Sequence, residues 1–196
     1  MNRFLSVLLK KLPGWTGEPI GEENLQAALA VLESNRAGYY THIQEEWPTE
    51  ENLRKDITAL PPGRSLSDKT FVLLYREGVP AAVVDYIESY PDETTGYVGL
   101  FLLDRGLHRQ GVGTTLFSAL EAAALETGKT RLELGCYETN GPGLSFWQKQ
   151  GFTELRRKSR TGADGKTRML LAMGKNWFTG RKPAGRRSFS ALPAAA

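Results

Sequence analysis

The first third of the chain has the hydrophobic spacing of helices. Residues 24–34 carry aliphatic side chains three and four positions apart, which places them on one face of a helix. A more polar helix is expected from Thr49 to about Ala59, and Pro61-Pro62-Gly63 stops it. The pattern therefore predicts that the first third is helical.

The pattern then changes to that of strands. Thr70–Tyr75 and Val79–Ile87 are rich in β-branched and aromatic residues, and Glu77-Gly78 between them is typical of a hairpin turn. A second turn, Tyr90–Glu93, precedes a third strand over Gly96–Leu103. We expect these three strands to form an antiparallel meander.

The third strand is predicted to be central. Its run Tyr97–Leu103 is apolar without alternation, which is typical of a strand covered on both faces. A glycine-rich turn at His108–Gly113 follows, then a helix to about Thr127 and a strand over Thr130–Tyr137. Because a strand, a crossover helix and a second strand form a parallel unit, these two strands should be parallel.

The remaining elements are predicted to close the sheet. Pro142 suits the first turn of a short helix, and Gly151-Phe152 suits its end. Two strands, near Phe152–Lys158 and Lys166–Met173, flank a turn at Thr161–Gly165. The predicted fold class is α/β: a single domain with a mixed, mostly antiparallel twisted sheet, helices on both faces and a central parallel strand pair.

Length and charge set the domain organisation. With 196 residues and 40% hydrophobic content, the chain is expected to form one well-packed domain. The net charge of +3 hides an asymmetry, because residues 174–196 carry five basic and no acidic side chains, which leaves −2 for the remainder. We predict a folded domain over residues 1–174 and a basic, disordered tail over 175–196. Nucleic-acid binding would depend on that tail alone and is not expected.

Cysteine usage and the N-terminus bear on location. Cys136 is the only cysteine, which excludes an intrachain disulfide and a multi-cysteine zinc site, and no metal site is predicted. Its alternation with Leu132 and Leu134 predicts a buried apolar side chain.

The run Phe4–Leu9 is too short for a membrane span, and Lys10-Lys11 follow it instead of a cleavage site. We expect a soluble, cytoplasmic protein without a membrane partner.

The glycine-rich turn carries the candidate chemistry. A helix N-terminus has about four unpaired N–H groups and the positive end of the helix dipole, so a turn entering a helix can bind an anion. A P-loop would need Lys and then Ser or Thr directly after Gly111, where Val112-Gly113 stands. A dinucleotide fingerprint would need a further glycine at Leu116. The remaining alternative is a tight structural turn.

The wider context of the turn distinguishes these alternatives. In order and without a gap, the sequence has an apolar strand, a turn with two glycines, a helix, a second strand, an asparagine and a short helix ending in Gly-Phe. These features are Leu100–Leu103, His108–Gly113, the helix to Thr127, Thr130–Tyr137, Asn140 and Phe146–Phe152. Together they resemble the GCN5-related N-acetyltransferase (GNAT) superfamily. The resemblance implies an N-acetyltransferase that moves an acetyl group from acetyl-CoA to a primary amine of a small molecule or peptide.

The resemblance also implies where acetyl-CoA binds as co-substrate. N–H groups of the turn would hold its pyrophosphate, and the pantetheine arm would lie where the central parallel strands are splayed apart. A backbone N–H near Leu102 or Leu103 would face the thioester carbonyl, with Leu103 as the expected catalytic donor, since a preorganised donor stabilises the charge that develops there. The residues implied to bind the co-substrate are Phe101, Leu102, Leu103, His108, Arg109, Gln110, Gly111, Val112, Gly113, Thr114, Asn140, Trp147 and Lys149.

Two residues depart from the family pattern. His108 stands where members usually have Gln or Arg, although the adjacent Arg109 supplies a positive charge. Trp147 stands seven residues after Asn140, where many relatives carry a Tyr that protonates the leaving thiolate, and tryptophan cannot act as that acid. Protonation of a thiolate with a pKa of ~8.5 is worth roughly 2 kcal/mol at neutral pH, so water can meet much of the need.

Deprotonation of the amine is the larger problem. An amine with a pKa of ~10.4 loses its proton at a cost of roughly 4 to 5 kcal/mol at neutral pH, so we expect a carboxylate base, acting directly or through water. The candidates are Asp85, Glu88 and Glu133, of which Asp85 stands in an otherwise apolar strand. A structural ion pair is the alternative for Asp85. Tyr39-Tyr40 are expected, with Asp85, to line the acceptor pocket, or else to pack in the core.

Two other functions remain open. In the first, the chain is a CoA-binding GNAT domain with little or no catalysis that acts as a sensor or partner protein, and Trp147 favours it. In the second, the basic tail tethers the protein to RNA or ribosomes. The sequence leaves the amine acceptor and the oligomeric state open, although the resemblance is compatible with a homodimer.

Overall fold

The computed structural model describes residues 2–43, 47–162 and 165–177. Its strands are β1 (Trp15–Pro19), β2 (Lys69–Arg76), β3 (Val79–Ile87), β4 (Thr95–Leu103), β5 (Arg131–Tyr137), β6 (Thr153–Thr161) and β7 (Thr167–Asn176). Its α-helices are α1 (Arg3–Lys10), α2 (Leu25–Glu33), α3 (Thr41–Ile43), α4 (Glu50–Thr58), α5 (Val112–Glu126) and α6 (Gly141–Lys149). A π-helical turn, Arg36–Tyr40, joins α2 to α3.

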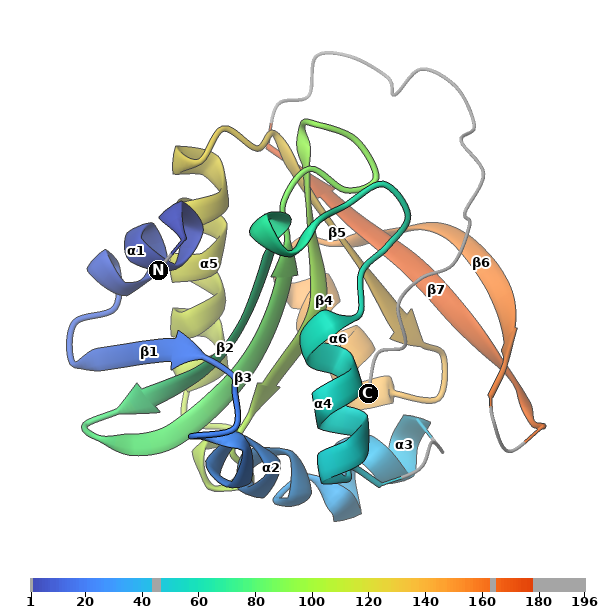
Figure 1. The fold of residues 1–196 in the computed structure, drawn as a ribbon. Coiled ribbons are helices and arrows are strands. Elements are labelled where there is room, and N and C mark those ends of the chain that lie inside the picture. Colours follow the sequence, from blue (N-terminus) through green and yellow to red (C-terminus); the bar gives the residue numbers. More distant parts are fainter. Residues whose placement is uncertain (1, 44–46, 163–164, 178–196) are drawn as a thin grey trace.

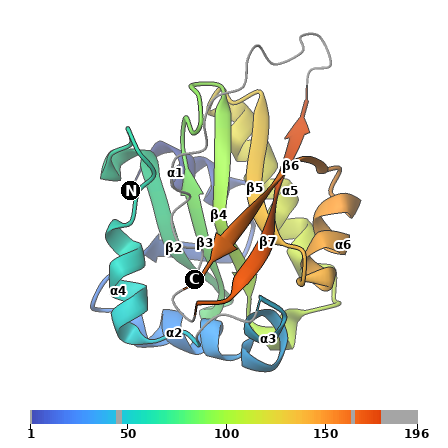
Figure 2. The same cartoon turned by 90° about the vertical axis from the view of Figure 1, so that its right-hand side faces the viewer.

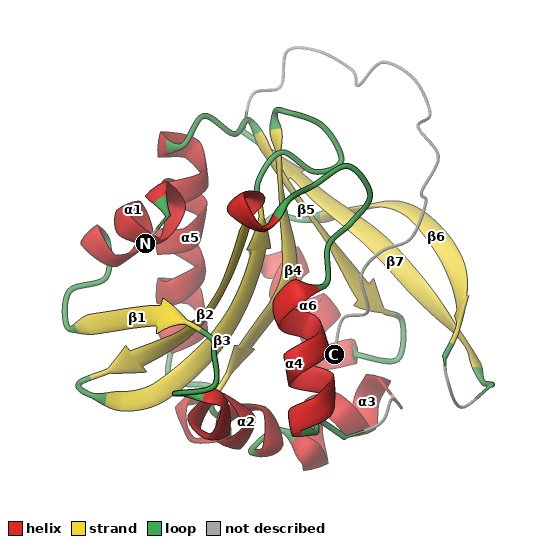
Figure 3. Cartoon of the chain, in the orientation of Figure 1, coloured by secondary structure: helices red, strands yellow, loops and turns green. Residues whose placement is uncertain are grey.

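The strands form one twisted sheet (Figure 1). The strand order is β1-β2-β3-β4-β5-β7-β6, and every neighbouring pair is antiparallel except β4 and β5. Helices lie on both faces of this sheet, as Figure 3 shows. The predicted fold class, with its meander of β2, β3 and β4 and its parallel pair, is therefore confirmed.

Alternation along the central strands divides the core into two layers. On β2, Val72 and Leu74 pack with side chains of α1 and α5, whereas Phe71 and Leu73 pack with side chains of α2 and α4. Figure 2 shows the sheet between these two groups of helices. Asp85 of β3 is paired with Phe71 and so belongs to the α2 and α4 side.

The N-terminal third differs in part from its prediction. The helices α2 and α4 form where expected, but β1 is a strand that pairs with β2 from Val72 to Arg76. The expectation that this third is entirely helical is therefore wrong. The strand signal is weak because β1 has five residues, and two of them are Gly17 and Pro19, which are depleted in strands.

The hydrophobic run near the N-terminus forms α1, which packs against the sheet. The ring of Phe4 stacks on that of Tyr86 from β3, with their centroids 3.8 Å apart. Across the described residues, no helix combines the length and the apolar character that a bilayer crossing requires.

The C-terminal strand is longer than predicted. β7 continues to Asn176, so Lys175 belongs to the sheet, and the indole Nε1 of Trp177 donates a hydrogen bond of 2.5 Å to Glu121 of α5. The rest of the predicted tail, residues 178–196, lies outside the described residues.

The parallel ladder between β4 and β5 is short. It joins Thr95–Val98 to Arg131–Leu134 and then ends, although both strands continue for several residues. At the same point β4 bulges away from regular pairing with β3, because Val98 and Leu100 have partners on β3 and Gly99 has none. The two parallel strands are therefore splayed beyond Val98, and this opening positions the candidate site.

Candidate active site

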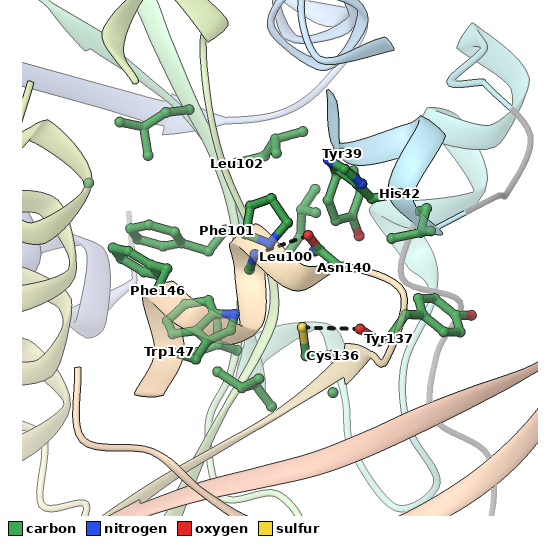
Figure 4. A pocket seen from close by; sticks show the side chains of 18 of the residues that line it. Tyr39, His42, Leu100, Phe101, Leu102, Cys136, Tyr137, Asn140, Phe146 and Trp147 are labelled. Atoms are coloured by element: carbon green, nitrogen blue, oxygen red, sulfur yellow. Dashed lines mark hydrogen bonds between the residues drawn. The ribbon is translucent and has the colours of Figure 1, made fainter. Parts of the chain in front are cut away.

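A cavity of about 920 Å³ lies where β4 and β5 separate. Its lining includes the splayed parts of both strands, the turn before α5, the start of α6 and the segment that carries α3. In Figure 4, Phe101, Phe146 and Trp147 lie on one side of Asn140, and Tyr39, His42 and Tyr137 lie on the other. The cavity therefore has one side with phenylalanine and tryptophan rings and another side with tyrosine and histidine side chains, and the two meet at the split in the sheet.

The turn that enters α5 brings unpaired N–H groups to the cavity. The helix begins after Gly111, whose φ of 79° is the left-handed backbone that glycine favours. In the part of the chain that the structure describes, no N–H group from Gly111 to Thr114 donates a hydrogen bond. Arg109 and Lys149 also line the cavity. These N–H groups, the positive end of the helix dipole and the two cations form a site suited to an anion.

Main-chain groups at the end of β4 point into the split. The N–H of Asp104 donates to the Ala81 carbonyl at the start of β3, with an N···O distance of 2.8 Å. Since N–H directions alternate along a strand, the N–H groups of Leu103 and Phe101 face the other way, toward β5. β5 offers no ladder partner there, because the pairing ends at Val98. Two main-chain donors are thus directed at the space between the strands.

The Leu103 carbonyl is held in place by side chains from two other segments. The amide Nδ2 of the fully buried Asn35 donates to this oxygen at 2.8 Å, and Nε2 of His108 lies 3.2 Å from it. Asn35 directly precedes the π-helical turn Arg36–Tyr40. The end of β4 is therefore connected to the segment that carries Tyr39.

An aromatic cluster makes one wall of the cavity. The Trp147 ring centroid lies between 4.9 and 5.5 Å from the centroids of Phe101, Phe117, Phe146 and Phe152. At the start of the same helix, the side-chain oxygen of Asn140 accepts a hydrogen bond of 3.0 Å from the N–H of Gly143. Trp147 supports the wall by packing, and Asn140 caps α6.

Asp85 brings a buried carboxylate to the cavity. Its Oδ2 accepts a hydrogen bond of 3.0 Å from Lys69 Nζ, so the ion pair expected as an alternative role is present. Its Oδ1 is also buried, but it has no hydrogen-bond partner among the described residues. Burial raises the pKa of this carboxyl above its ordinary value, while the charge and hydrogen bond of Lys69 oppose that shift. One oxygen is thus fixed by the protein, and the other has no hydrogen-bond partner among the described residues.

The comparisons with known proteins identify the family. The model of the acetyltransferase (GNAT) family matches residues 16–152. The chain belongs to this family. The resemblance noted from the sequence is thereby confirmed, and the matched region contains the splayed strands, the turn before α5 and α6.

Solved structures with the same fold are also acetyltransferases. One is an acetyltransferase from Thermus thermophilus, with 22% identity, coverage of 83% of this chain and 96% of that chain, and a TM-score of 0.66. Another is the ribosomal-protein-S18-alanine N-acetyltransferase from Escherichia coli, with 17% identity, coverage of 90% and 99%, and a TM-score of 0.60. PaiA N-acetyltransferase from Thermoplasma acidophilum, solved in complex with coenzyme A, has 17% identity, coverage of 83% and 99%, and a TM-score of 0.57. A comparison with curated proteins finds no match.

Most residues that the GNAT resemblance implied line this one cavity. They are Phe101, Leu102, Leu103, His108, Arg109, Gly111, Gly113, Thr114, Asn140, Trp147 and Lys149, together with Tyr39 and Asp85 from the expected acceptor pocket. Gln110, Val112 and Tyr40 do not line it. Gln110 instead donates to the Gly106 carbonyl at 2.6 Å, while Val112 and Tyr40 pack in the two core layers. Their roles in binding stay predictions.

The structure separates the three candidate carboxylates. Of Asp85, Glu88 and Glu133, only Asp85 lines the cavity. Glu133 is buried elsewhere on β5, where one oxygen pairs with Arg131 and the other lies 3.6 Å from Arg156. This leaves Asp85 as the one predicted base that could meet a substrate in the cavity.

Sequence reasoning assigned no role to four other residues of the cavity lining. They are His42, Asp56, Arg105 and Tyr137. They stand on separate elements that are far apart in the sequence, so no spacing pattern could have grouped them. Cys136 also lines the cavity, and its burial, which was predicted, raises the pKa of its thiol to about 12.

Proposed function

We propose that this GNAT protein transfers the acetyl group of acetyl-CoA to a primary amine of a small molecule or peptide. The observation that carries the proposal is the split in the sheet beyond Val98, which joins the unpaired N–H groups of Gly111–Thr114 to a cavity with a buried carboxylate. A purely structural turn would also leave N–H groups unpaired, but it would not explain the cavity with a buried carboxylate beside them.

The cavity has the features that acetyl-CoA requires. The N–H groups at the start of α5, with Arg109 and Lys149, suit a diphosphate. The space between β4 and β5 suits an extended arm, and amide groups of such an arm would find partners in the N–H groups of Phe101 and Leu103. The volume of about 920 Å³ is in the upper part of the range of ~300–1,000 Å³ for small-molecule sites.

The residues of the chain divide the chemistry between them. Acetyl-CoA supplies an acyl group on a thioester. The N–H of Leu103 donates to the carbonyl oxygen and so stabilises the charge that develops there. The Asp85 carboxylate accepts a proton from the acceptor amine, directly or through one water. Trp147 shapes the wall and transfers no proton.

A second candidate is a GNAT domain that binds CoA but has little or no catalysis. The residue that favours it is Trp147, because its indole packs among four phenylalanines and offers no acid to the leaving thiolate. The two candidates differ in one measurable property, which is turnover with an amine.

We expect the purified protein to release CoA thiol from acetyl-CoA when it is screened against amines. The name of the Escherichia coli neighbour specifies a protein amine, so the screen should include peptides as well as amino acids and small amines. Acetylated product is identified by mass spectrometry. Binding of CoA without product from any amine would favour the second candidate, and no binding of CoA would contradict both.

Replacement of Gly111 tests the anion site. Gly111 and Gly128 both have left-handed backbone, with φ of 79° and 92°, and neither has an atom within 4 Å of an added Cβ. Each alanine variant should therefore lose about 1 kcal/mol of stability from backbone strain. Only Gly111→Ala places a methyl group where the diphosphate is proposed to bind, so the Kd for CoA should rise about tenfold or more, a change of ~1.4 kcal/mol. Equal Kd values for the two variants by calorimetry would contradict the assignment.

Replacement of Asp85 tests the base. Asp85→Asn is nearly isosteric but cannot accept the proton, so turnover at neutral pH should fall by about 100-fold or more. The loss should shrink as pH rises, because the free amine becomes more abundant without help from the protein. The measurement is the pH dependence of kcat. Glu88→Gln is the control, because it removes a carboxylate that does not line the cavity. An equal loss at every pH would indicate a structural role.

Replacement of Trp147 tests whether an acid is needed at this position. Trp147→Phe keeps an aromatic ring in the cluster, so turnover should stay within about threefold of the wild type while thermal stability falls, because buried aromatic contacts are lost. The measurements are kcat, the Kd for CoA and the Tm. A collapse of kcat with an unchanged Kd would show that the indole takes part in the reaction.

A further inference from the structure

Lys69 is a buried cation beside the proposed base. It is the first residue of β2 and is only 8% exposed. Its Nζ lies 3.0 Å from Oδ2 of Asp85 and 2.9 Å from the carbonyl oxygen of Ala59, and 5.1 Å from the centroid of the Phe71 ring. A lysine buried to this extent requires oxygen partners, and it has two.

The fold fixes Lys69 in this position from two directions. In the β2–β3 ladder, Lys69 is paired with Ile87 and Phe71 with Asp85, so Lys69 and Asp85 are diagonal neighbours on one face of the sheet. Ala59 is the C-terminal cap of α4, where the helix dipole is negative and favours a cation. The ammonium group is thus held between a helix end and a carboxylate.

The same contacts fix the orientation of the Asp85 carboxylate at the edge of the cavity. Lys69 occupies Oδ2, which lies so close to the β4 bulge that a Cβ at Gly99 would be 2.7 Å from it. Oδ1 remains without a partner in the described part of the protein, and Asp85 lines the cavity. We propose that Lys69 is a positioning residue for acetyl transfer, which favours the ionised form of the Asp85 carboxylate and fixes its orientation at the cavity that would hold the acceptor amine. This inference rests on the proposed function.

The proton balance of the step is simple. The acceptor ammonium gives one proton to the Asp85 carboxylate, and the nitrogen lone pair then forms the C–N bond. The C–S bond breaks with its electron pair on sulfur, and the second nitrogen proton passes to that sulfur through water. Lys69 takes no part in these transfers and acts only through Asp85.

Other titratable and charged groups line the same cavity as Asp85. Tyr97 lies beside it on β4, where burial raises the pKa of the phenol. Asp56 from α4, His42 from α3 and Arg160 from β6 line the same cavity. Among the residues described, Lys69 is the cation with an ion pair to Asp85.

The test replaces Lys69 with Met, with Arg as the variant that keeps the charge. Loss of the cation raises the pKa of Asp85, because Lys69 is the group that opposes the effect of burial, so the carboxyl should ionise at higher pH than in the wild type. In Lys69→Met the acid limb of the kcat profile should move to higher pH by at least one unit. At pH values on that limb, kcat should be about tenfold lower than in the wild type, and this loss should disappear at high pH. Lys69→Arg should restore most of the wild-type profile.

Lys129→Met is the matched control. Lys129 is also buried, at 7% exposure, with Nζ 2.7 Å from Ser89 Oγ and 3.1 Å from the Glu93 carbonyl oxygen, and it does not line the cavity. Its replacement should leave the pH profile in place. A loss in Lys69→Met that is the same at all pH values, or that matches the effect of Lys129→Met, would overturn the proposal.

A second readout does not depend on activity. The Asp85 carboxyl can be titrated by NMR in protein with isotope-labelled aspartate, and its signal is assigned by its absence in Asp85→Asn. Its midpoint should lie at higher pH in Lys69→Met than in the wild type. An unchanged midpoint would contradict the inference even if the enzyme is active. If no amine supports turnover, the proposed function fails, and the NMR titration still decides the role of Lys69.

Discussion

The end of the parallel ladder between β4 and β5 is the constraint on which the site depends. Beyond Val98 and Leu134 the two strands have no common hydrogen bonds, and Gly99 bulges at the same level. The side chain of Asp85 occupies the space that a Cβ at Gly99 would need, so glycine is required for this approach. The N–H groups of Phe101 and Leu103 then face a gap, where water or a ligand has to satisfy them.

The split also separates two helix N-termini, which the chain treats differently. α5 follows β4 and α6 follows β5, so both helices begin beside the cavity. Asn140 caps α6 by accepting from the N–H of Gly143, whereas Gly111 has no side chain with which to cap α5. Among the described residues, α5 therefore presents more unpaired donors than α6, and this asymmetry favours an anion on one side of the split.

Two buried carboxylates show how charge is distributed in the sheet. Both oxygens of Glu133 have an arginine nearby, so the whole group is used within the protein. Asp85 has a partner at one oxygen only, although burial of an unpaired oxygen destabilises the fold. An incompletely paired group that lines a cavity is better explained by a ligand or substrate than by stability. The hydrogen bond from Asn35 to the Leu103 carbonyl connects the segment that carries Tyr39 to the end of β4.

The sequence by itself determined the order of the elements, the parallel pair and the glycine turn. These features follow from local periodicity and from glycine at fixed positions, which do not depend on distant contacts. β1 was missed because a short edge strand with glycine and proline has almost no local signal, and β2 selects it by pairing. Asp85 was singled out as a charge in an apolar strand, but its partner could not be named, because Lys69 reaches it across the ladder from 16 positions away. The grouping of Tyr39, His42, Asp56 and Tyr137 around the split was decided by tertiary structure alone, since each stands on a different element and only the packing of helices on the sheet brings them together.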